Sequence, residues 1–292
     1  KFFPTVAVVT SVDADHLDYY NSIEEIGQTF LKFINKVPFF GSAVLCLDQE
    51  NIQQLIPQVE KRYITYGIET RADLMAEQIQ VEGPTSRYQV CFKGEVLGEI
   101  HLKMPGHHNI SNSLAAIAVG LELDISFDHI RKALESFQGI HRRFEIIGQV
   151  QDIIIVDDYA HNPAKLRAVF RAACESYSRR VVAIFQPHRH QRVRHLAEEF
   201  SRSFYQTDIL IVTSIYSAGE APIEGVTAEN LANAIQAHGH RNVIYIPDKD
   251  QIVNALMSII QSNDIIITAG AGDIWQVGRD LLDKLQQNSA CK

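Results

Sequence analysis

Short apolar runs alternate with amphipathic segments at the start of the chain. Residues 5–10, Thr-Val-Ala-Val-Val-Thr, have the β-branched composition of a strand that is buried on both faces. Residues 22–35 follow a helical pattern, and Ser22 is the N-cap candidate. An apolar run at 43–47 and a short helical segment at 50–54 continue the same order. This alternation of strand and helix predicts a parallel sheet.

The pattern changes in the middle of the chain. Three short strand-like segments, separated by glycine-containing turns, predict an antiparallel appendage at residues 78–83, 87–93 and 96–103. Two helical segments follow, at about 109–122 and 126–137.

A second series of strand-like and helical segments begins after Gly139. Its five apolar strands are expected at 153–156, 181–185, 209–213, 243–246 and 265–268. Amphipathic helices are expected at about 163–177, 193–206, 227–238, 248–261 and 273–287. Five strands with alternating helices predict a Rossmann-like, doubly wound parallel sheet. The sequence therefore predicts the α/β fold class and two domains, 1–139 and 140–292.

Composition and charge narrow the functional classes. The 292 residues are 46% hydrophobic and 21% charged, which is ordinary for a globular protein with a sizeable core. The formal net charge of −8 argues against nucleic-acid binding through bulk electrostatics. No apolar run reaches the roughly 18 residues that a membrane-spanning helix needs, so we expect no membrane association. The four scattered cysteines are typical of reduced thiols in a cytosolic protein. Because an apolar strand begins almost at once and no Met precedes it, we expect a longer protein.

Polar residues that follow a strand are the first candidates for chemistry, because ligands bind at the carboxyl ends of strands in open α/β sheets. Residues 13–18, Asp-Ala-Asp-His-Leu-Asp, place three carboxylates and the imidazole of His16 after the first strand. Oxygen ligands suit Mg²⁺, and a single histidine is tolerated. The alternative is a polar loop in which one aspartate caps a helix.

Residues 106–112, Gly-His-His-Asn-Ile-Ser-Asn, stand at a predicted helix start. Asn109 and Asn112 are three residues apart and share a helix face. An asparagine amide offers a donor and an acceptor, which matches an adenine edge. On spacing alone, the simpler interpretation is that Asn109 caps the helix.

A buried strand leads directly into Asp157, Asp158, Tyr159 and His161, just before a helix-starting proline. An acid just past a strand can hold ribose hydroxyls. A capping role for one aspartate leaves the other three side chains unexplained, so this segment favours a binding site.

Three arginines and two histidines lie within residues 188–194, directly after another predicted strand. Arginine binds carboxylate or phosphate through two parallel hydrogen bonds, and the amides of a helix N-terminus assist. The alternative is a solvated charged face, but the position at a strand end argues against it. Zinc is disfavoured because His188 and His190 are only two residues apart and no cysteine is near.

Two further motifs are ambiguous. The Arg142-Arg143 pair at the domain junction is either structural or reaches a phosphate as the domains close. Gly270-Ala271-Gly272 follows a strand and is interpreted as a tight turn. The sequence contains no G-x-x-x-x-G-K-[S/T] segment, so these 292 residues include no phosphate-cradling P-loop.

Together these segments resemble the Mur ligase family of peptidoglycan synthesis over essentially all 292 residues. The segments that carry the resemblance are DADHLD (13–18), GHHNISNSLAA (106–116), HRRFE (141–145), DDYAHNP (157–163), QPHRHQR (186–192), YSAGEAPIEG (216–225) and GAGD (270–273). The last four are typical of members that add alanine and of their near relatives. The resemblance implies the rear part of the central ATP-binding domain, residues 1–139, followed by the C-terminal amino-acid-binding domain, residues 140–292.

The resemblance also implies the chemistry and the residues that perform it. ATP and Mg²⁺ would be the cofactors, UDP-N-acetylmuramate and L-alanine the substrates, and an acyl phosphate the intermediate of a carbon–nitrogen ligation in the bacterial cytoplasm. The implied ATP-binding residues are His108, Asn109, Asn112, Arg143 and Asp158, and the implied Mg²⁺ ligand is His16. His161, Arg189 and Arg192 match the catalytic group that holds the amino acid and its carboxylate, with Tyr159 and His188 as further substrate-binding candidates.

This sequence departs from the family pattern at two places. Asn162 stands where many relatives have a second histidine, and His190-Gln191 stand where an aromatic and a small polar residue are usual. A homo-oligomer is compatible with the sequence. Without a P-loop, the 292 residues alone are expected to be inactive.

Two alternatives stay open. One is a ligase of murein recycling that uses the same sugar nucleotide but joins it to a tripeptide. The other is a non-catalytic, nucleotide-binding remnant, which the missing P-loop favours.

Overall fold

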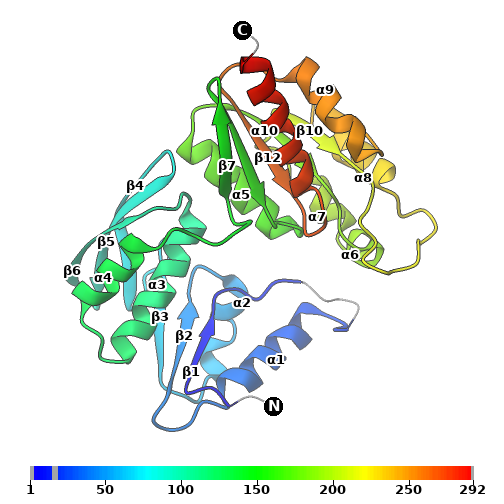
Figure 1. Ribbon diagram of the computed structural model, residues 1–292. Helices are drawn as coiled ribbons and strands as arrows, with labels where there is room; N and C mark the ends of the chain where they lie inside the picture. Colours follow the sequence, from blue (N-terminus) through cyan, green and yellow to red (C-terminus); the bar gives the residue numbers. More distant parts are fainter. Residues whose placement is uncertain (1–2, 15–18, 291–292) are drawn as a thin grey trace. The chain divides into compact units, whose positions relative to one another are not determined.

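The computed structural model describes residues 3–14 and 19–290 (Figure 1). The chain forms two compact units, Lys1–Gln138 and Gly139–Lys292, each with its own six-stranded sheet. This division lies one residue before the predicted boundary. Among the described residues, no helix is both long enough and apolar enough to cross a membrane.

The first unit contains six strands, four α-helices and a short 3-10 helix in its described part. The strands are β1 (Val6–Val9), β2 (Ser42–Cys46), β3 (Tyr63–Gly67), β4 (Leu74–Glu82), β5 (Thr85–Phe92) and β6 (Glu95–Leu102). The helices are α1 (Ile23–Ile34), α2 (Glu50–Gln53), η1 (Ile56–Gln58), α3 (His107–Glu122) and α4 (Phe127–Ser136).

The first sheet runs β1-β2-β3-β4-β5-β6, with parallel pairing from β1 to β4 and antiparallel pairing from β4 to β6. The predicted antiparallel strands are present as β4, β5 and β6, but they continue the parallel sheet, because Tyr66 and Gly67 of β3 pair with Leu74 and Met75 of β4. Strand β3 was not predicted, since the sequence Tyr-Ile-Thr-Tyr-Gly has no continuous aliphatic run.

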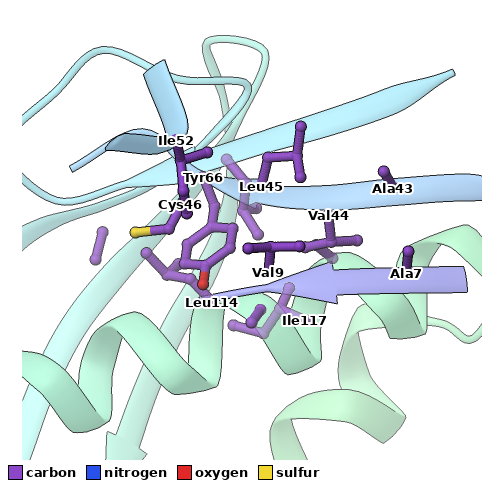
Figure 2. Close-up of a cluster of buried hydrophobic side chains, with 14 of the residues drawn as sticks. Ala7, Val9, Ala43, Val44, Leu45, Cys46, Ile52, Tyr66, Leu114 and Ile117 are labelled. Carbon is purple, nitrogen blue, oxygen red and sulfur yellow. The ribbon is translucent and has the colours of Figure 1, made fainter. Parts of the chain in front are cut away.

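Part of the hydrophobic core of the first unit lies between β1–β3 and helix α3 (Figure 2). Leu114 and Ile117 project from α3 toward Val9, Val44 and the ring of Tyr66, and all five side chains are almost completely buried (Figure 2). Burial of this apolar area fixes α3 on the sheet.

Two helix starts in the first unit can be compared with the sequence. Ser22 caps α1, since its side chain accepts a hydrogen bond from the Glu25 amide, which confirms the prediction. Helix α3 begins at His107, two residues before the predicted start. Its N-cap is Gly106, whose φ of 92° favours glycine, so Asn109 is not the cap.

The second unit alternates strands and helices along its length. The strands are β7 (Glu145–Val150), β8 (Ile153–Asp158), β9 (Arg180–Phe185), β10 (Ile209–Val212), β11 (Val243–Tyr245) and β12 (Asp264–Ala269). The helices are α5 (Pro163–Ser176), α6 (His190–His195), α7 (Ala197–Ser201), α8 (Ala228–Ala237), η2 (Lys249–Gln251), α9 (Ile252–Ile259) and α10 (Trp275–Ala290).

The second sheet has the order β11-β10-β9-β12-β8-β7 and is parallel except for β7. The five predicted parallel strands are present, whereas the antiparallel edge strand β7 was missed because it is only partly buried. The single helix predicted at 193–206 is two helices, because the backbone leaves the helical region at Leu196.

Helices cover both faces of this sheet. Ile184 of β9 belongs to a buried cluster with Leu256 of α9 and Leu281 of α10. Because neighbouring residues of a strand point to opposite faces, Phe185 lies on the other side, where its ring contacts Phe200 of α7. The sheet is therefore doubly wound, as predicted, and its strand ends are free to carry loops.

Candidate functional site

The carboxyl ends of three neighbouring strands meet in the second unit. Ala269, the last residue of β12, pairs with both Asp158 of β8 and Phe185 of β9. The loops that leave these strands therefore start side by side. They carry the predicted site residues of this unit, apart from the junction arginines.

The first loop begins at Asp158, whose carboxylate is almost completely buried. Oδ2 accepts a hydrogen bond from the Phe144 amide and Oδ1 accepts one from the Ala160 amide, both at 2.7 Å. Burial raises the pKa of Asp158 to about 6, although the two amides and the nearby Arg143 oppose this shift. Both oxygens thus bind backbone amides of the second unit, and the burial of the carboxylate leaves little of it open to a ribose.

The two junction arginines have different surroundings. The Arg142 guanidinium donates from Nε to Asp157 Oδ2 at 2.9 Å and from its terminal nitrogens to the carbonyls of Gly270, at 2.7 Å, and Gly272, at 3.3 Å. It therefore joins the β8 end to the glycine turn after β12. Arg143 is exposed, and its guanidinium lies 5.5 Å from the ring centroid of Tyr159.

His161 is held in a fixed orientation after β8. Its Nδ1 lies 2.7 Å from the Tyr159 carbonyl oxygen, and because a carbonyl only accepts, Nδ1 carries a proton. The imidazole is only 8% exposed and meets the Tyr159 ring edge to face. Asn162 caps α5 by accepting a hydrogen bond from the Lys165 amide, so the departure from the usual histidine supplies a helix cap.

His188 and Arg192 form the centre of the arginine-rich loop after β9. The Arg192 guanidinium lies 3.3 Å from His188 Nδ1 and 3.4 Å from the His188 carbonyl oxygen. Burial lowers the pKa of His188, and the charges of Arg192 and Arg189 lower it further. The imidazole is therefore a neutral hydrogen-bond acceptor beside a cation. The rings of His161 and His188 are 6.0 Å apart, so the two predicted histidines lie together.

Arg189 stands where the loop turns into α6. Its φ of 68° is unusual for a side-chain-bearing residue and places it at the helix N-cap, so the helix begins earlier than predicted. Its guanidinium is 44% exposed and lies 4.0 Å from a carboxylate oxygen of Glu220. The loop thus presents one exposed and one partly buried arginine, a pair that suits a carboxylate or phosphate.

The predicted adenine-contacting residues stand at the start of α3 in the first unit. Asn109 is buried and donates from Nδ2 to the Pro105 carbonyl oxygen at 2.7 Å, which leaves its Oδ1 as an acceptor. Asn112 is exposed and His108 is half-buried. The two asparagines therefore have different surroundings although they are three residues apart.

The predicted Mg²⁺ ligand His16 lies outside the described residues. Over residues 3–14 and 19–290, no group of three or more histidine, cysteine, aspartate or glutamate side chains is arranged to hold a metal ion. The Mg²⁺ assignment stays a prediction.

Comparison with known proteins decides the family. Residues 1–120 match the Mur ligase middle domain, and residues 142–272 match the Mur ligase glutamate ligase domain. The chain belongs to the Mur ligase family. It is 50% identical over 287 residues to the UDP-N-acetylmuramate–L-alanine ligase of Syntrophotalea carbinolica, which covers 98% of this chain and 63% of that protein. It is 52% identical over 286 residues to the enzyme of the same name from Geotalea uraniireducens, covering 98% and 62%.

Solved structures agree with this assignment. The UDP-N-acetylmuramate–alanine ligase of Thermotoga maritima superposes with a TM-score of 0.78 at 25% identity, covering 98% of this chain and 61% of that one. A Mur ligase of another type from Thermotoga maritima, solved with ADP, has a TM-score of 0.78 at 16% identity and shows the shared fold. This Mur ligase chain thus spans a little over 60% of the length of these relatives.

Several residues beside the candidate site were not singled out by the sequence analysis. Tyr216 stacks on His188, with ring centroids 5.5 Å apart and an interplanar angle of 8°, although it follows β10 at a distance in sequence. Gln186 donates to Asp273 Oδ1 at 2.8 Å, and Lys249 pairs with the same carboxylate. Gln186, Tyr216 and Asp273 lie in segments that carry the family resemblance, but the sequence analysis assigned no role to these three residues. A Cβ at Gly272 would lie 2.7 Å from Tyr216 Cγ, so the glycine is needed for this close packing.

Proposed function

We propose that this chain belongs to a bacterial, cytoplasmic, ATP-dependent ligase that joins L-alanine to the carboxylate of UDP-N-acetylmuramate through an acyl phosphate. The observation that carries the proposal is the identity of about half of all positions, over 98% of the chain, with relatives that are named for this reaction. The arginine and histidine side chains at the ends of β8 and β9 support it, because they supply the groups that an amino acid requires.

In this proposal, the side chains of the site bind and orient the amino acid. Arg192 and Arg189 neutralise and orient the carboxylate of the amino acid. Because Arg192 is partly buried, its attraction to this carboxylate is screened less by water. His161, held by the Tyr159 carbonyl, points its ring toward His188 at a fixed angle. Such pre-organised side chains lower the entropy cost of aligning an amine with its electrophile.

The family resemblance implies ATP contacts in each unit, and the residues of each unit are considered separately. ATP supplies the phosphoryl group that activates the muramate carboxylate. The exposed Asn112 amide offers donors and an acceptor, which fits an adenine edge, whereas Asn109 uses one of its two amide N–H groups on the Pro105 carbonyl oxygen. The exposed Arg143 fits a phosphate, because its guanidinium lies over the Tyr159 ring and faces solvent. The buried Asp158 fits a ribose less well, and His16 as a Mg²⁺ ligand rests on the family resemblance.

The decisive experiment measures phosphate release by the full-length gene product with ATP, Mg²⁺ and UDP-N-acetylmuramate. Release that depends on L-alanine is expected. Release with the tripeptide but not with L-alanine would instead identify the recycling ligase, whose solved relative from Psychrobacter arcticus has a TM-score of 0.63 at 23% identity. No release with either acceptor would favour the nucleotide-binding remnant. The 292 residues alone should release no phosphate, because they contain no P-loop lysine.

A further inference from the structure

A cavity of about 620 Å³ lies in the first unit, where β4 ends, β5 begins and β6 ends beside helix α4 (Figure 1). Its volume is within the range of about 300–1,000 Å³ that is typical of small-ligand sites. None of the residues considered above for ATP, Mg²⁺ or the amino acid lines it. The lining residues are Gln80 and Glu82 of β4, residues 85–87 of β5, residues 101–103 at the end of β6, and Glu135 of α4.

The strands that form the cavity have one buried and one exposed face. Tyr88 of β5 and Ile100 of β6 are paired across the two strands and are completely buried in the core. Because successive residues of a strand alternate between its faces, the next pair, Arg87 and His101, points away from the core. Both of these side chains are 52% exposed. The exposed face therefore places a guanidinium and an imidazole side by side.

Arg87, His101 and Lys103 give the cavity three basic side chains. Lys103 comes directly after the last residue of β6 and forms no salt bridge with another described residue. Arg87 and His101 share the carboxylate of Glu99, whose Oε1 lies 2.7 Å from His101 Nε2 and 3.9 Å from Arg87 Nε. Like charges directly opposite each other on neighbouring strands destabilise a sheet. An added anion would remove this repulsion.

The kinds of donor in this cluster favour a phosphate over a carboxylate. The guanidinium of Arg87 can donate two parallel hydrogen bonds to two oxygens of one anion, and the ammonium of Lys103 adds a point charge from the neighbouring strand. A carboxylate has only two oxygens, which a single arginine saturates. A phosphate monoester has three terminal oxygens, so both side chains can bind it at the same time.

The cavity also contains two carboxylates, Glu82 and Glu135. Neither forms a salt bridge within the part of the chain that the structure describes, although Arg87 and Lys103 line the same cavity. Carboxylates accept hydrogen bonds from hydroxyl groups, and the Gln80 amide offers both donors and an acceptor. A ligand that carries a phosphate at one end and hydroxyls at the other therefore suits both the basic and the acidic side chains.

We propose that this cavity binds the phosphate monoester of a polyol, of the size of a sugar phosphate. Arg87 and Lys103 bind the phosphate, and Glu82, Glu135 and Gln80 bind the hydroxyls. The site goes beyond the proposed ligase function and does not depend on it, because the two have no residue in common. Its failure would leave the ligase assignment unchanged.

The test follows binding at the cavity itself, through the NMR signal of the His101 imidazole in the full-length gene product labelled with ¹³C-histidine. His101→Gln identifies this signal by its loss. The probes are glucose 6-phosphate, which carries both groups, inorganic phosphate, which carries only the anion, and glucose, which carries only hydroxyls. We expect glucose 6-phosphate to shift the signal saturably and to bind at least about threefold more tightly than phosphate, the scale of an added neutral hydrogen bond.

Two substitutions remove the cations that bind the phosphate. Lys103→Gln and Arg87→Gln should each weaken glucose 6-phosphate by at least about tenfold, the scale of a lost charge-assisted hydrogen bond. Lys93→Gln is the matched control, because Lys93 is an exposed lysine of the β5–β6 turn outside the cavity. This control should leave the affinity unchanged within about twofold, as expected for an exposed charge away from the site.

Glu135→Gln gives a result that a damaged fold cannot give. Because it removes a negative charge from the cavity, inorganic phosphate should bind about threefold more tightly. Glucose 6-phosphate should gain less than phosphate, because the amide is a weaker acceptor for its hydroxyls than the carboxylate is.

Three outcomes would overturn the proposal. The first is a His101 signal that no probe shifts. The second is binding of glucose 6-phosphate that responds to neither Lys103→Gln nor Arg87→Gln. The third is equal affinity for phosphate and glucose 6-phosphate, because the hydroxyls would then play no part. Phosphate release that depends on L-alanine, measured on the same preparation, tests the ligase function separately.

Discussion

Arg142 Nε lies 2.9 Å from Asp157 Oδ2 inside the second unit, where the carboxylate is 3% exposed. The same carboxylate accepts a hydrogen bond from the Thr268 hydroxyl at 2.7 Å through its other oxygen. The pair therefore connects the junction segment, β8 and β12. Arg143, one residue later, takes no part in this network and is exposed.

This difference predicts unequal effects of two neighbouring substitutions on stability. Arg142→Ala should lower the free energy of unfolding by about 3–5 kcal/mol, because it leaves Asp157 charged and buried without its partner. Arg143→Ala should cost less than about 1 kcal/mol, the scale of an exposed contact between a cation and a ring. Chemical denaturation followed by the fluorescence of Trp275, the single tryptophan, reports on the second unit. Equal losses for the two variants would contradict the structural role of Arg142.

Asp158 predicts a pH dependence of stability. Its folded-state pKa of about 6 lies above the ordinary value of 3.8, so the folded chain binds more protons than the unfolded chain between about pH 4 and pH 6. The contribution of Asp158 to stability is therefore greatest below pH 4 and falls as the pH rises through 6, by up to roughly 3 kcal/mol. Denaturation at pH 4.5 and pH 7 should show a smaller fall in Asp158→Asn than in the wild type. A ¹³C NMR titration of the carboxyl carbon that gave a pKa near 4 would refute this prediction.

The arginine loop predicts which substrate binds less tightly when an arginine of the loop is replaced by lysine. Arg192→Lys and Arg189→Lys in the full-length gene product should each raise KM for L-alanine and lower kcat, because an ammonium cannot form two parallel bonds to a carboxylate. We expect kcat/KM for alanine to fall at least about thirtyfold, from a lost contact of roughly 2–5 kcal/mol, while KM for ATP changes little. Arg194→Lys, an exposed arginine of the same helix, is the control. Alanine kinetics within about twofold of the wild type in both variants would favour the solvated-face interpretation.

The protonation of His188 should respond to Arg192 and Glu220 in opposite directions. Burial and the positive charge of Arg192 lower its pKa, and Glu220 raises it. Arg192→Gln should therefore move the pKa of His188 up toward its ordinary value, and Glu220→Gln should move it further down. Proton NMR titration of the imidazole C2 resonance measures both shifts. The absence of a shift in both variants would show that burial alone controls this histidine.

The sequence was sufficient to predict the parts of the fold that depend on continuous apolar runs. The buried strands β8, β9, β10 and β12 are such runs, and all four were placed within about one or two residues of their observed bounds. Strands β3 and β7 were missed because their burial depends on neighbouring strands. Their own side chains are mixed in polarity and only partly buried at several positions.

Like the fold, the candidate site could be predicted from the sequence only in part. The polar residues directly after β8 and β9 could be predicted, because their positions follow from the strand ends. The partners Tyr216, Lys249 and Asp273 come from three other loops, and only the folded sheet brings them to Gln186 and His188. Nor could the sequence show that both Asp158 oxygens bind backbone amides, since one of these amides is 14 residues away.

The central position of β12 in its sheet affects the order in which the second unit can fold during synthesis. It is the last strand in the sequence, yet it lies between β8 and β9, with Ile266 paired to Ile155 on one side and to Val182 on the other. On the ribosome, β8 and β9 therefore emerge long before the strand that joins them. Their inner edges stay open to wrong pairing until residues 264–269 have left the exit tunnel. The loops that hold His161 and Arg192 are brought to their final separation only at that late stage of synthesis.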